Sequence, residues 1–426
     1  MEKTGNVMLE FAKLLFPICR SITGNGTRTS LNLIKKFVPN LNLYEVPTGT
    51  KAFDWIVPKE WNINDAYLLD PDGRKVISFK DNNLHVLNYS VPVDTILPLD
   101  ELQRHLYSLP DQPTAIPYIT SYYAPRWGFC LSENQRKSLK PGNYRAVIDS
   151  TLENGSLTYG ELLIPGKVDR EVLLSTYVCH PSMANNELSG PVVLTEIAKM
   201  LCSTATLKYS YRLLFLPETI GSLVYLSRNL KVMKERTIAG LTVTCIGDER
   251  AYSYLESRLG NTLSDRAAKS VLKNLAPNYL SYSFLERGSD ERQYCAPGVD
   301  LPIASIMRSK YGVYPEYHTS LDNFDLVTAK GLAGGYRAIS DFIEVIEKNE
   351  TLNSTVLCEP QLGPRGLYPT ISTKSQYEST KIMMDLLAYC DGTRDLLEIA
   401  EKIQHPVQKL FSIVETLKYH RLLATV

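Results

Sequence analysis

A buried strand that runs into a histidine-bearing turn and then a helix constrains the fold of this chain more than any other feature. Residues 172–178 form an apolar, β-rich run, and the turn after it carries His180, Asn186 and Glu187. Apolar residues then recur at helical spacing over residues 193–201. Strand, turn and helix in this order are typical of α/β enzymes, which place reactive groups at the carboxyl ends of strands. This stretch alone allows a metal-binding histidine or one that caps an Asn-rich turn.

Further strands alternate with helices along the middle of the chain. Apolar β-rich runs and helical spacing follow one another, with strands predicted at residues 144–148, 155–164, 211–216, 238–246 and 301–305 and helices at residues 261–275 and 329–347. This order predicts an α/β fold with a mixed or parallel sheet covered by helices on both faces.

Two segments depart from that alternation. Residues 41–132 hold short β-like runs separated by turns such as Pro71-Asp72-Gly73, which predicts a small β-rich domain inserted into the α/β framework. Three short helices and a terminal strand predict a winged-helix domain at residues 362–426. The α/β domain then comprises residues 1–40 and 133–350. The aromatic residues of the insertion either pack its core or form the wall of a cleft: Trp55, Trp61, Tyr122, Tyr123 and Trp127.

The charge balance argues against a nucleic-acid or membrane-surface partner. Lysine and arginine number 46, as do aspartate and glutamate, so the formal net charge is zero. The last predicted helix carries only Lys409 and Lys418, with Glu415 between them, whereas a DNA-reading helix usually presents a basic stripe. We therefore favour a packing role for the winged helix, within the chain or between subunits of a homo-oligomer.

The first residues and the cysteines indicate where the protein works. Residues 1–20 contain no apolar segment long enough for a signal peptide or a membrane span. The eight cysteines are dispersed, lack CxxC spacing and in several cases lie within apolar runs, which fits reduced thiols. The sequence thus predicts a cytoplasmic protein without a membrane partner.

Polar side chains accumulate where the predicted strands end: His180, Asn186, Glu187, Glu218, Asp248, Asp290, Glu291, His318 and Asp322. In a doubly wound sheet these ends meet at one rim, so two of the six histidines would lie among several carboxylates. Imidazole and carboxylate groups bind zinc, which lowers the pKa of a bound water. Glu218 suits a general base, because partial desolvation after a buried strand would raise its pKa. Strand-end carboxylates also cap helices, and the spacing leaves that interpretation open.

Four motifs resemble those of the co-catalytic zinc aminopeptidases and glutamate carboxypeptidases. His180 with ANNELSG at residues 184–190 resembles their His and DDxxSG element, and PETIGS at residues 217–222 resembles their EExG and GS element. Gly288-Ser289-Asp290 matches their GSDH, and HTSLD at residues 318–322 matches their HTxxD, all in the family's order.

Nearly the whole chain resembles bacterial aminopeptidase-like proteins that join such a peptidase domain to a C-terminal winged helix. Members of that group are associated with surface-polysaccharide or small-molecule biosynthesis. The resemblance implies a zinc-aminopeptidase-like mixed sheet flanked by helices, with a β-rich insertion, and a small peptide or aminoacyl substrate.

The chain departs from the peptidase pattern at several ligand positions. The Asp that bridges two zinc ions falls at Asn186, and the second Glu of the family's pair falls at Thr219. The Asp expected after the third strand falls at Thr244, with Asp248 nearby, and the His of GSDH falls at Glu291. The uncharged amide of Asn186 cannot neutralise the charge of two zinc ions, so we expect one zinc ion rather than two.

These comparisons of motifs predict a role for each candidate residue. His180 and His318 would bind the zinc with one carboxylate from among Asp290, Glu291 and Glu187. Glu218 would take a proton from water and pass it to the leaving amine. The predicted substrate-binding residues, some of which could hold a substrate carboxylate or stabilise an oxyanion and equally could be ordinary packing residues, are Asn186, Arg292, Arg308 and Tyr311.

The sequence therefore predicts a zinc-dependent amide or peptide hydrolase of the aminopeptidase type, acting on a small aminoacyl or peptidyl conjugate. Two alternatives come from other functional classes. One is a catalytically inactive relative that binds a ligand or partner, and the other, which is disfavoured, is a DNA-binding regulator.

Overall fold

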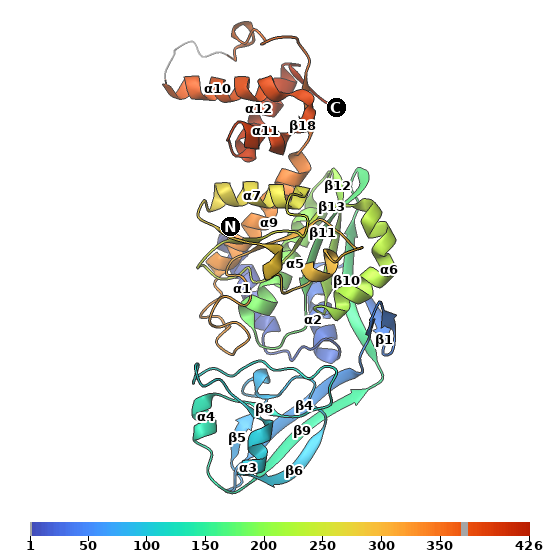
Figure 1. The fold of residues 1–426 in the computed structure, drawn as a ribbon, viewed down its shortest axis with the longest axis vertical. Coiled ribbons are helices and arrows are strands. Elements are labelled where there is room, and N and C mark those ends of the chain that lie inside the picture. The colour runs from blue at the N-terminus through green and yellow to red at the C-terminus, as the bar shows by residue number, and fades with distance from the viewer. Residues whose placement is uncertain (1, 368–373) are drawn as a thin grey trace. The chain divides into compact units, whose positions relative to one another are not determined.

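The computed structural model describes residues 2–367 and 374–426. The chain forms two compact units (Figure 1). The first comprises Met1–Ser264 and Leu280–Ile339, and the second comprises Asp265–Tyr279 and Ser340–Val426. Within the described residues, no helix is both long enough and apolar enough to span a bilayer. Part of the predicted winged-helix domain, residues 368–373, lies outside the described residues.

An eight-stranded mixed sheet forms the centre of the first unit and confirms the predicted α/β fold. Its strands, in sheet order, are β1 (Asn42–Pro47), β10 (Ser156–Ile164), β12 (Tyr209–Leu216), β11 (Val168–Tyr177), β13 (Thr237–Thr242), β16 (Ile303–Met307), β14 (Ser253–Leu255) and β15 (Leu280–Tyr282). Strands β12, β11, β13 and β16 are parallel, and Leu174 of β11 lies between Leu213 and Leu241. These central strands are continuous apolar runs because both faces of the sheet are covered.

Helices cover this sheet in the order that the chain connectivity requires. The connection from β11 to β12 and the connection from β12 to β13 step in opposite directions across the sheet, so right-handed crossovers place α5 and α6 on opposite faces (Figure 1). The helices that include residues of the first unit are α1 (Glu2–Leu15), α2 (Asn25–Phe37), α5 (Ser189–Ser203), α6 (Ile220–Arg236), α7 (Leu263–Leu275), α8 (Glu291–Tyr294) and α9 (Ala329–Lys348).

A second, antiparallel sheet forms the predicted β-rich insertion. Its order is β5-β4-β9-β6, with β5 at Lys75–Ser78, β4 at Glu60–Leu69, β9 at Asn143–Glu153 and β6 at Val93–Pro98. Short elements complete the insertion: β2 (Lys51–Ala52), β3 (Trp55–Ile56), the 3-10 helices Asn83–His85 and Gln103–His105, α3 (Leu99–Leu102), β7 (Leu106–Tyr107), β8 (Phe129–Cys130) and α4 (Glu133–Lys137).

The sheets do not change at the predicted domain boundaries, residues 41 and 132. Strand β1 pairs with β10 of the large sheet, so the α/β part extends past residue 41. Strand β9 pairs with β4 and β6, so the insertion sheet extends past residue 132 to Glu153. The two long strands β9 and β10 follow one another across a short turn, and local sequence gives no sign that they belong to different sheets.

The second unit has the order of helices expected of a winged-helix domain. It contains α10 (Lys374–Tyr389), α11 (Leu396–Lys402) and α12 (Val407–Tyr419), with a three-stranded antiparallel sheet ordered β18 (Asp391–Asp395), β17 (Thr351–Ser354) and β19 (Leu423–Thr425). Asp395 caps α11, accepting a hydrogen bond from the Glu398 backbone, and it also pairs with Arg266 at 2.7 Å. Leu397, Leu410 and Leu417 are fully buried in its core.

Candidate functional site

A cavity of about 360 Å³ lies beyond the carboxyl ends of β11 and β12. Its walls combine residues of the α/β part and of the insertion: Ile22, Trp55, Tyr118, Thr120, Tyr122, Tyr123, Cys179, His180, Glu218, Thr219, Ile220, Arg292 and His318. The Tyr118 amide donates a 2.9 Å hydrogen bond to the His318 carbonyl, which joins the insertion to the histidine-bearing loop. Four of the predicted site residues thus line one cavity: His180, Glu218, Arg292 and His318.

The two predicted histidines lie side by side in this cavity. Their ring centroids are 5.6 Å apart, and the ring of Tyr118 contacts both edge-on at 5.2 Å. The ring of Tyr317 stacks on His318 at 3.9 Å. Burial, and then the nearby charge of His180, lower the pKa of His318 to about 3. His318 is therefore neutral at physiological pH, which is the state in which an imidazole binds a metal.

Glu187 lies behind His180 rather than in the cavity. His180 Nδ1 donates a 2.8 Å hydrogen bond to Glu187 Oε2, while Glu187 Oε1 accepts one from the Cys179 amide and lies 3.5 Å from Arg20 Nε. Burial lowers the pKa of His180, but Cys179 and Glu187 outweigh burial and raise this pKa well above its usual range. Burial raises the pKa of the Cys179 thiol to about 11, so the Cys179 thiol is neutral near pH 7 and Glu187 is the anion that holds the imidazolium proton.

Glu218 is the carboxylate that lines the cavity together with the two histidines. It follows β12, its Oε2 lies 3.6 Å from His180 Nε2, and its Oε1 accepts a 2.8 Å hydrogen bond from Ser289 Oγ. Burial raises the pKa of Glu218, and the charge of His180 partly opposes that rise. This placement agrees with the reason for which the sequence favoured Glu218 as a base, namely partial desolvation at a strand end.

A strained turn holds Glu218 in this position. Thr219 has φ +65° and ψ −72°, and the Ile220 amide donates to the Glu218 carbonyl at 2.7 Å, which makes a γ-turn between β12 and α6. Asp290 Oδ1 accepts hydrogen bonds from the Thr219 amide (2.7 Å) and from Ser222 Oγ (2.9 Å), and Arg292 donates to Thr219 Oγ1 at 2.6 Å. Asp290 therefore braces the turn and does not line the cavity.

Three other predicted site residues are engaged outside the cavity. Glu291 Oε1 accepts hydrogen bonds from the Gly288 and Ser289 amides and, at 2.6 Å, from the Tyr311 hydroxyl. Arg308 donates to the Ala251 carbonyl at 2.6 Å, and its guanidinium lies 4.0 Å from the centroid of the Tyr252 ring. None of Glu291, Tyr311 and Arg308 is among the cavity-lining residues of the described chain.

Asn186 and Thr244, which stand where the resembling peptidases have carboxylates, belong to a neutral hydrogen-bonded cluster. Asn186 Nδ2 donates to the Tyr177 hydroxyl at 2.8 Å, and this hydroxyl lies 2.5 Å from Thr244 Oγ1. Asn186 Oδ1 is buried and has no hydrogen-bond partner within the described chain. Asp248 is not a substitute here, because it accepts hydrogen bonds from Asn185 Nδ2 and from the backbone and side chain of Ser309.

Two residues outside the predicted site organise it. Asp322 accepts hydrogen bonds from the backbone amides of Ala184, Asn185 and Asn186 and from the Tyr314 hydroxyl, so it fixes the turn after β11. Burial raises the pKa of Asp322 to about 6, against these hydrogen bonds. The HTSLD motif pointed to Asp322. Arg20, which donates to the His180 carbonyl at 3.0 Å, carried no signal in the sequence.

The donor groups in the cavity fit one divalent cation better than two. The hydrogen bond to Glu187 uses Nδ1 of His180 and leaves Nε2 available. His318 is neutral, and the Glu218 carboxylate lies 3.6 Å from His180 Nε2. Cys179, His180 and Glu187 also bring ligand atoms within 4.8 Å of one another, but there His180 Nδ1 is committed to Glu187 and the thiol is neutral. The Asn186, Tyr177 and Thr244 cluster supplies no negative charge for a second ion.

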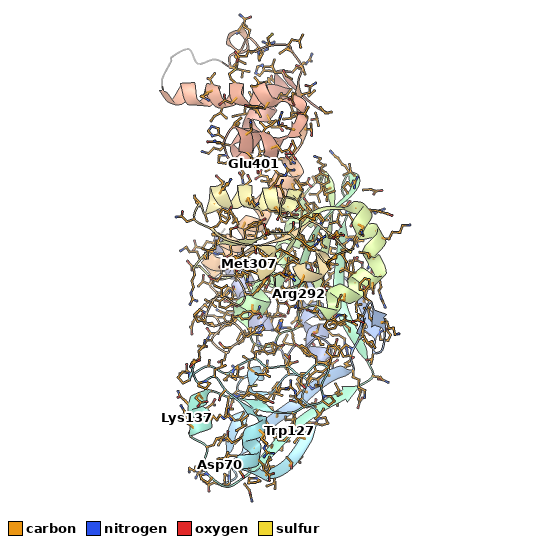
Figure 2. The ribbon with its side chains drawn as sticks, viewed as in Figure 1. Asp70, Trp127, Lys137, Arg292, Met307 and Glu401 are labelled. Carbon is orange, nitrogen blue, oxygen red and sulfur yellow. The ribbon has the colours of Figure 1, made fainter. Side chains whose placement is uncertain are left out.

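The predicted aromatic residues of the insertion divide between cavity wall and core. Trp55, Tyr122 and Tyr123 line the cavity. Trp61 is buried and donates from Nε1 to the Ser90 carbonyl. Trp127 stacks on His105 at 3.7 Å within the insertion, and Figure 2 shows it apart from Arg292.

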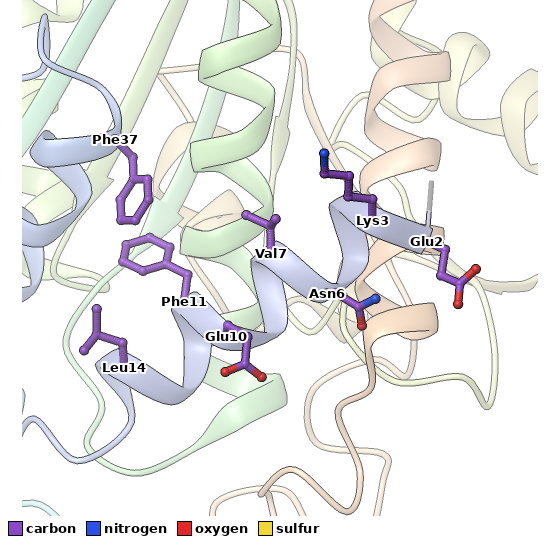
Figure 3. Close-up of a pocket in the computed structure, with 8 residues that line it drawn as sticks. All are labelled: Glu2, Lys3, Asn6, Val7, Glu10, Phe11, Leu14 and Phe37. Atoms are coloured by element: carbon purple, nitrogen blue, oxygen red, sulfur yellow. The ribbon is translucent and has the colours of Figure 1, made fainter.

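A larger hollow of about 730 Å³ lies along α1 but carries no catalytic constellation. Figure 3 shows its lining, seven side chains from one face of α1 and Phe37 of α2. Phe11 and Phe37 contact each other there at 4.5 Å between ring centroids. Without an imidazole or thiol in that lining, this hollow is not the candidate active site.

Comparisons with known proteins identify relatives of both parts of the chain. A family described as "Domain of unknown function (DUF4910)" matches residues 9–349, and a winged helix-turn-helix family matches residues 350–425. A Clostridium acetobutylicum protein, named for polysaccharide biosynthesis and an aminopeptidase-like domain, is 48% identical over 403 residues, which are 94% of this chain and 92% of that protein.

Two solved structures show the same fold. A crystal structure from Clostridium acetobutylicum, described as that of a peptidase, superposes with a TM-score of 0.94 at 44% identity, over 100% of this chain and 97% of that one. A zinc aminopeptidase from Bacillus subtilis superposes with a TM-score of 0.58 at 11% identity, over 80% of this chain and 94% of that one. The predicted aminopeptidase-like fold and the C-terminal winged helix are therefore confirmed.

Proposed function

We propose that this chain, which belongs to the DUF4910 family and has an aminopeptidase-like fold, is a metal-dependent amide or peptide hydrolase of the aminopeptidase type. One observation carries the proposal: His180, His318 and Glu218, which are far apart in sequence, line one cavity, with the imidazole rings 5.6 Å apart and Glu218 3.6 Å from His180. Two imidazole rings beside a partly desolvated carboxylate form the arrangement that metal-assisted hydrolysis needs.

His180 through Nε2 and His318 would hold one zinc ion. The third donor that we propose is Asn186 Oδ1, which stands at the bridging position of the resembling peptidases. It is buried without a hydrogen-bond partner in the described chain, as Asp290 Oδ2 and Glu291 Oε2 also are. Of the carboxylate ligands that the sequence offered, Glu187 uses both oxygens to hold His180 and the Cys179 amide. Asp290 and Glu291 each hold a turn through one oxygen and keep the other without a partner in the described chain, so they stay the alternative third donors. Zinc, when bound, polarises a carbonyl group and lowers the pKa of water.

Glu218 is the general base and acid of the proposed reaction. Its Oε2 takes a proton from the attacking water and delivers it to the nitrogen of the leaving amine, while Ser289 holds Oε1. Arg292 lines the same cavity and is oriented by its hydrogen bonds to Thr219 Oγ1 and the Ser289 carbonyl, so it would bind an anionic part of the substrate.

The cellular compartment and the biological role of this activity are also proposals. All eight cysteines are free thiols, which supports a reducing, cytoplasmic compartment. The name of the Clostridium acetobutylicum relative supports a biosynthetic role, with a small aminoacyl or peptidyl conjugate as substrate.

Metal analysis combined with turnover tests the proposed function. Protein purified without chelators should hold about one zinc per chain and hydrolyse aminoacyl or acylaminoacyl anilides; dialysis against a chelator should abolish this turnover, and added zinc should restore it. His180→Ala and His318→Ala should lose the metal, whereas His105→Ala, which alters a histidine stacked on Trp127 in the insertion, should keep it. Retention of stoichiometric zinc by both cavity variants would refute the proposed site.

A further inference from the structure

The cavity lining is poor in anionic groups that could pair with a charged amino terminus. Among the described residues that line it, Glu218 is the one carboxylate. Its Oε1 is occupied by Ser289, and its Oε2 faces His180 Nε2. The other ionisable groups there include Arg292, which is cationic. Pairing a buried ammonium group with Glu218 would engage the carboxylate that the proposed reaction uses as its base, so this lining disfavours a free α-amino group.

An aromatic path leads from the cavity to the surface. Trp55 and Tyr123 line the cavity, contact each other edge to face at 5.8 Å, and remain 38% and 54% exposed. Trp55 belongs to the β2–β3 hairpin, whose Phe53 and Ile56 are 53% and 49% exposed. Partly exposed aromatic side chains that line a cavity of a soluble protein commonly mark a binding surface.

The hairpin turn itself is not optimised for folding. Phe53 has φ +57°, a conformation in which glycine or asparagine would be less strained and in which a bulky side chain is rare. An exposed aromatic residue in a strained turn gains nothing from core packing. A contact with a bound ligand would account for an aromatic side chain at this position.

The inner part of the aromatic wall is held rigidly. The Tyr122 hydroxyl lies 2.6 Å from the Tyr118 hydroxyl, and the Tyr122 ring packs edge-on against Tyr89 at 5.2 Å. Tyr89 in turn stacks on the buried Trp61 at 5.7 Å. Side chains fixed in this way lose little conformational entropy when an apolar group binds against them.

We propose that the substrate is an N-acylated amide whose apolar acyl group lies along Trp55 and Tyr123, rather than a peptide with a free amino terminus; this inference rests on the hydrolase function proposed above. The acyl group would extend from the cavity along the exposed parts of Trp55 and Tyr123. Its scissile amide would lie beside Glu218, and the uncharged N-acyl linkage would need no counter-ion.

Binding to the metal-free protein tests this proposal without turnover. Calorimetry would compare alaninamide with its N-acetyl, N-butanoyl and N-hexanoyl derivatives. We expect no measurable binding of alaninamide and an affinity that rises by roughly tenfold for every two methylenes added, because a buried methylene contributes about 0.8 kcal/mol. Trp55→Ala and Tyr123→Ala should each weaken N-hexanoyl-alaninamide at least tenfold. Tyr44→Ala, which removes a ring that is also 38% exposed but lies on β1 and stacks on Tyr159, should leave that affinity unchanged.

The outcomes separate this inference from the proposed function. Binding of alaninamide as tight as that of the acyl derivatives, or a chain-length dependence that survives both Trp55→Ala and Tyr123→Ala, would overturn the acyl proposal and leave the hydrolase proposal standing. Chain-length-dependent binding that both variants abolish would support the acyl site. If zinc-loaded protein then hydrolysed no member of the series or its anilides, the hydrolase proposal alone would fail.

Discussion

His180 Nδ1 donates a 2.8 Å hydrogen bond to Glu187 Oε2, and both side chains are buried. This bond fixes the ring of His180 and leaves Nε2 directed to the side of Glu218. A carboxylate behind a metal-binding histidine raises the basicity of the ring and sets its orientation. The pair therefore couples the stability of the turn after β11 to the chemistry of the cavity.

Glu187→Gln should lower both the stability of the protein and its affinity for zinc. The amide keeps the shape but leaves the buried guanidinium of Arg20 without its anion, so we expect the free energy of unfolding to fall by about 3–5 kcal/mol. Zinc affinity should fall by roughly 10–100-fold. Denaturant unfolding and chelator competition measure the two effects, with the exposed Glu153→Gln as control. An unchanged zinc affinity would show that Glu187 does not position His180.

Glu218→Gln should remove the proposed base and leave the protein folded. Because proton transfer by a positioned group contributes about 10²–10⁴-fold, we expect kcat to fall by that factor while zinc content and melting temperature stay near those of the parent. Glu235→Gln, at an exposed position on α6, is the matched control. A variant with undiminished kcat would rule out Glu218 as the base.

Asp290→Asn should change how stability depends on pH. Burial, and then the charge of Glu218, raise the pKa of Asp290 to about 7, from the ordinary value of 3.8. Between these values the unfolded chain releases a proton that the folded chain keeps, so the contribution of Asp290 to stability is full below about pH 4 and is lost as the pH rises toward 7. Asparagine cannot ionise and still offers Oδ1 to Thr219 and Ser222.

Relative to the parent, Asp290→Asn should therefore gain stability as the pH rises from about 4 to 7, by on the order of 3 kcal/mol. Urea unfolding at intervals across this range measures the difference. Asp149→Asn, at an exposed position on β9, is the matched control. A constant difference for Asp290→Asn would show that Asp290 ionises normally.

Strand ends could be predicted from the sequence, whereas the direction of each side chain could not. Apolar runs located β11 and β12, and parallel strands bring His180, Glu218 and His318 to one rim as expected. The same reasoning placed Asp290 and Glu291 in that rim, but backbone amides that become available only in the folded turns attract both carboxylates. Such competition between a metal and local amide donors depends on distances of a few ångströms, which spacing along the chain does not encode.

Contacts over long sequence separations account for most of what was missed. Arg20 reaches Glu187 across 167 positions of chain, and a lone arginine after an amphipathic helix has no local mark of that role. The change from one sheet to the other also lies away from the predicted boundaries for this reason, since β1 and β9 are ordinary strands whose partners, β10 and β4, decide which sheet they join.

Asn186→Asp should strengthen metal binding. Asn186 Oδ1 is buried without a partner in the described chain, and a carboxylate there would add a negative charge next to Tyr177, whose ring contacts that of His180. We expect zinc affinity to rise at least tenfold, because a carboxylate binds zinc more strongly than an amide. Asn62→Asp, in the insertion, is the control. Chelator competition measures both variants, and an affinity unchanged by Asn186→Asp would exclude Asn186 as a ligand.

The winged helix should not bind DNA at physiological salt. Of the lysines on α12, Lys409 is exposed, while Lys418 is paired with Glu350 at 2.5 Å and Glu415 adds an opposing charge. With one exposed lysine on α12, nonspecific phosphate binding by this helix should vanish at about 150 mM salt, because each phosphate contact makes the affinity fall with salt. Fluorescence anisotropy of labelled duplex with the full chain measures this. Glu415→Lys should raise affinity at low salt and so verify the sensitivity of the assay. Binding of the parent chain at 150 mM salt that Lys409→Glu abolishes would contradict the prediction and revive a regulatory role for this domain.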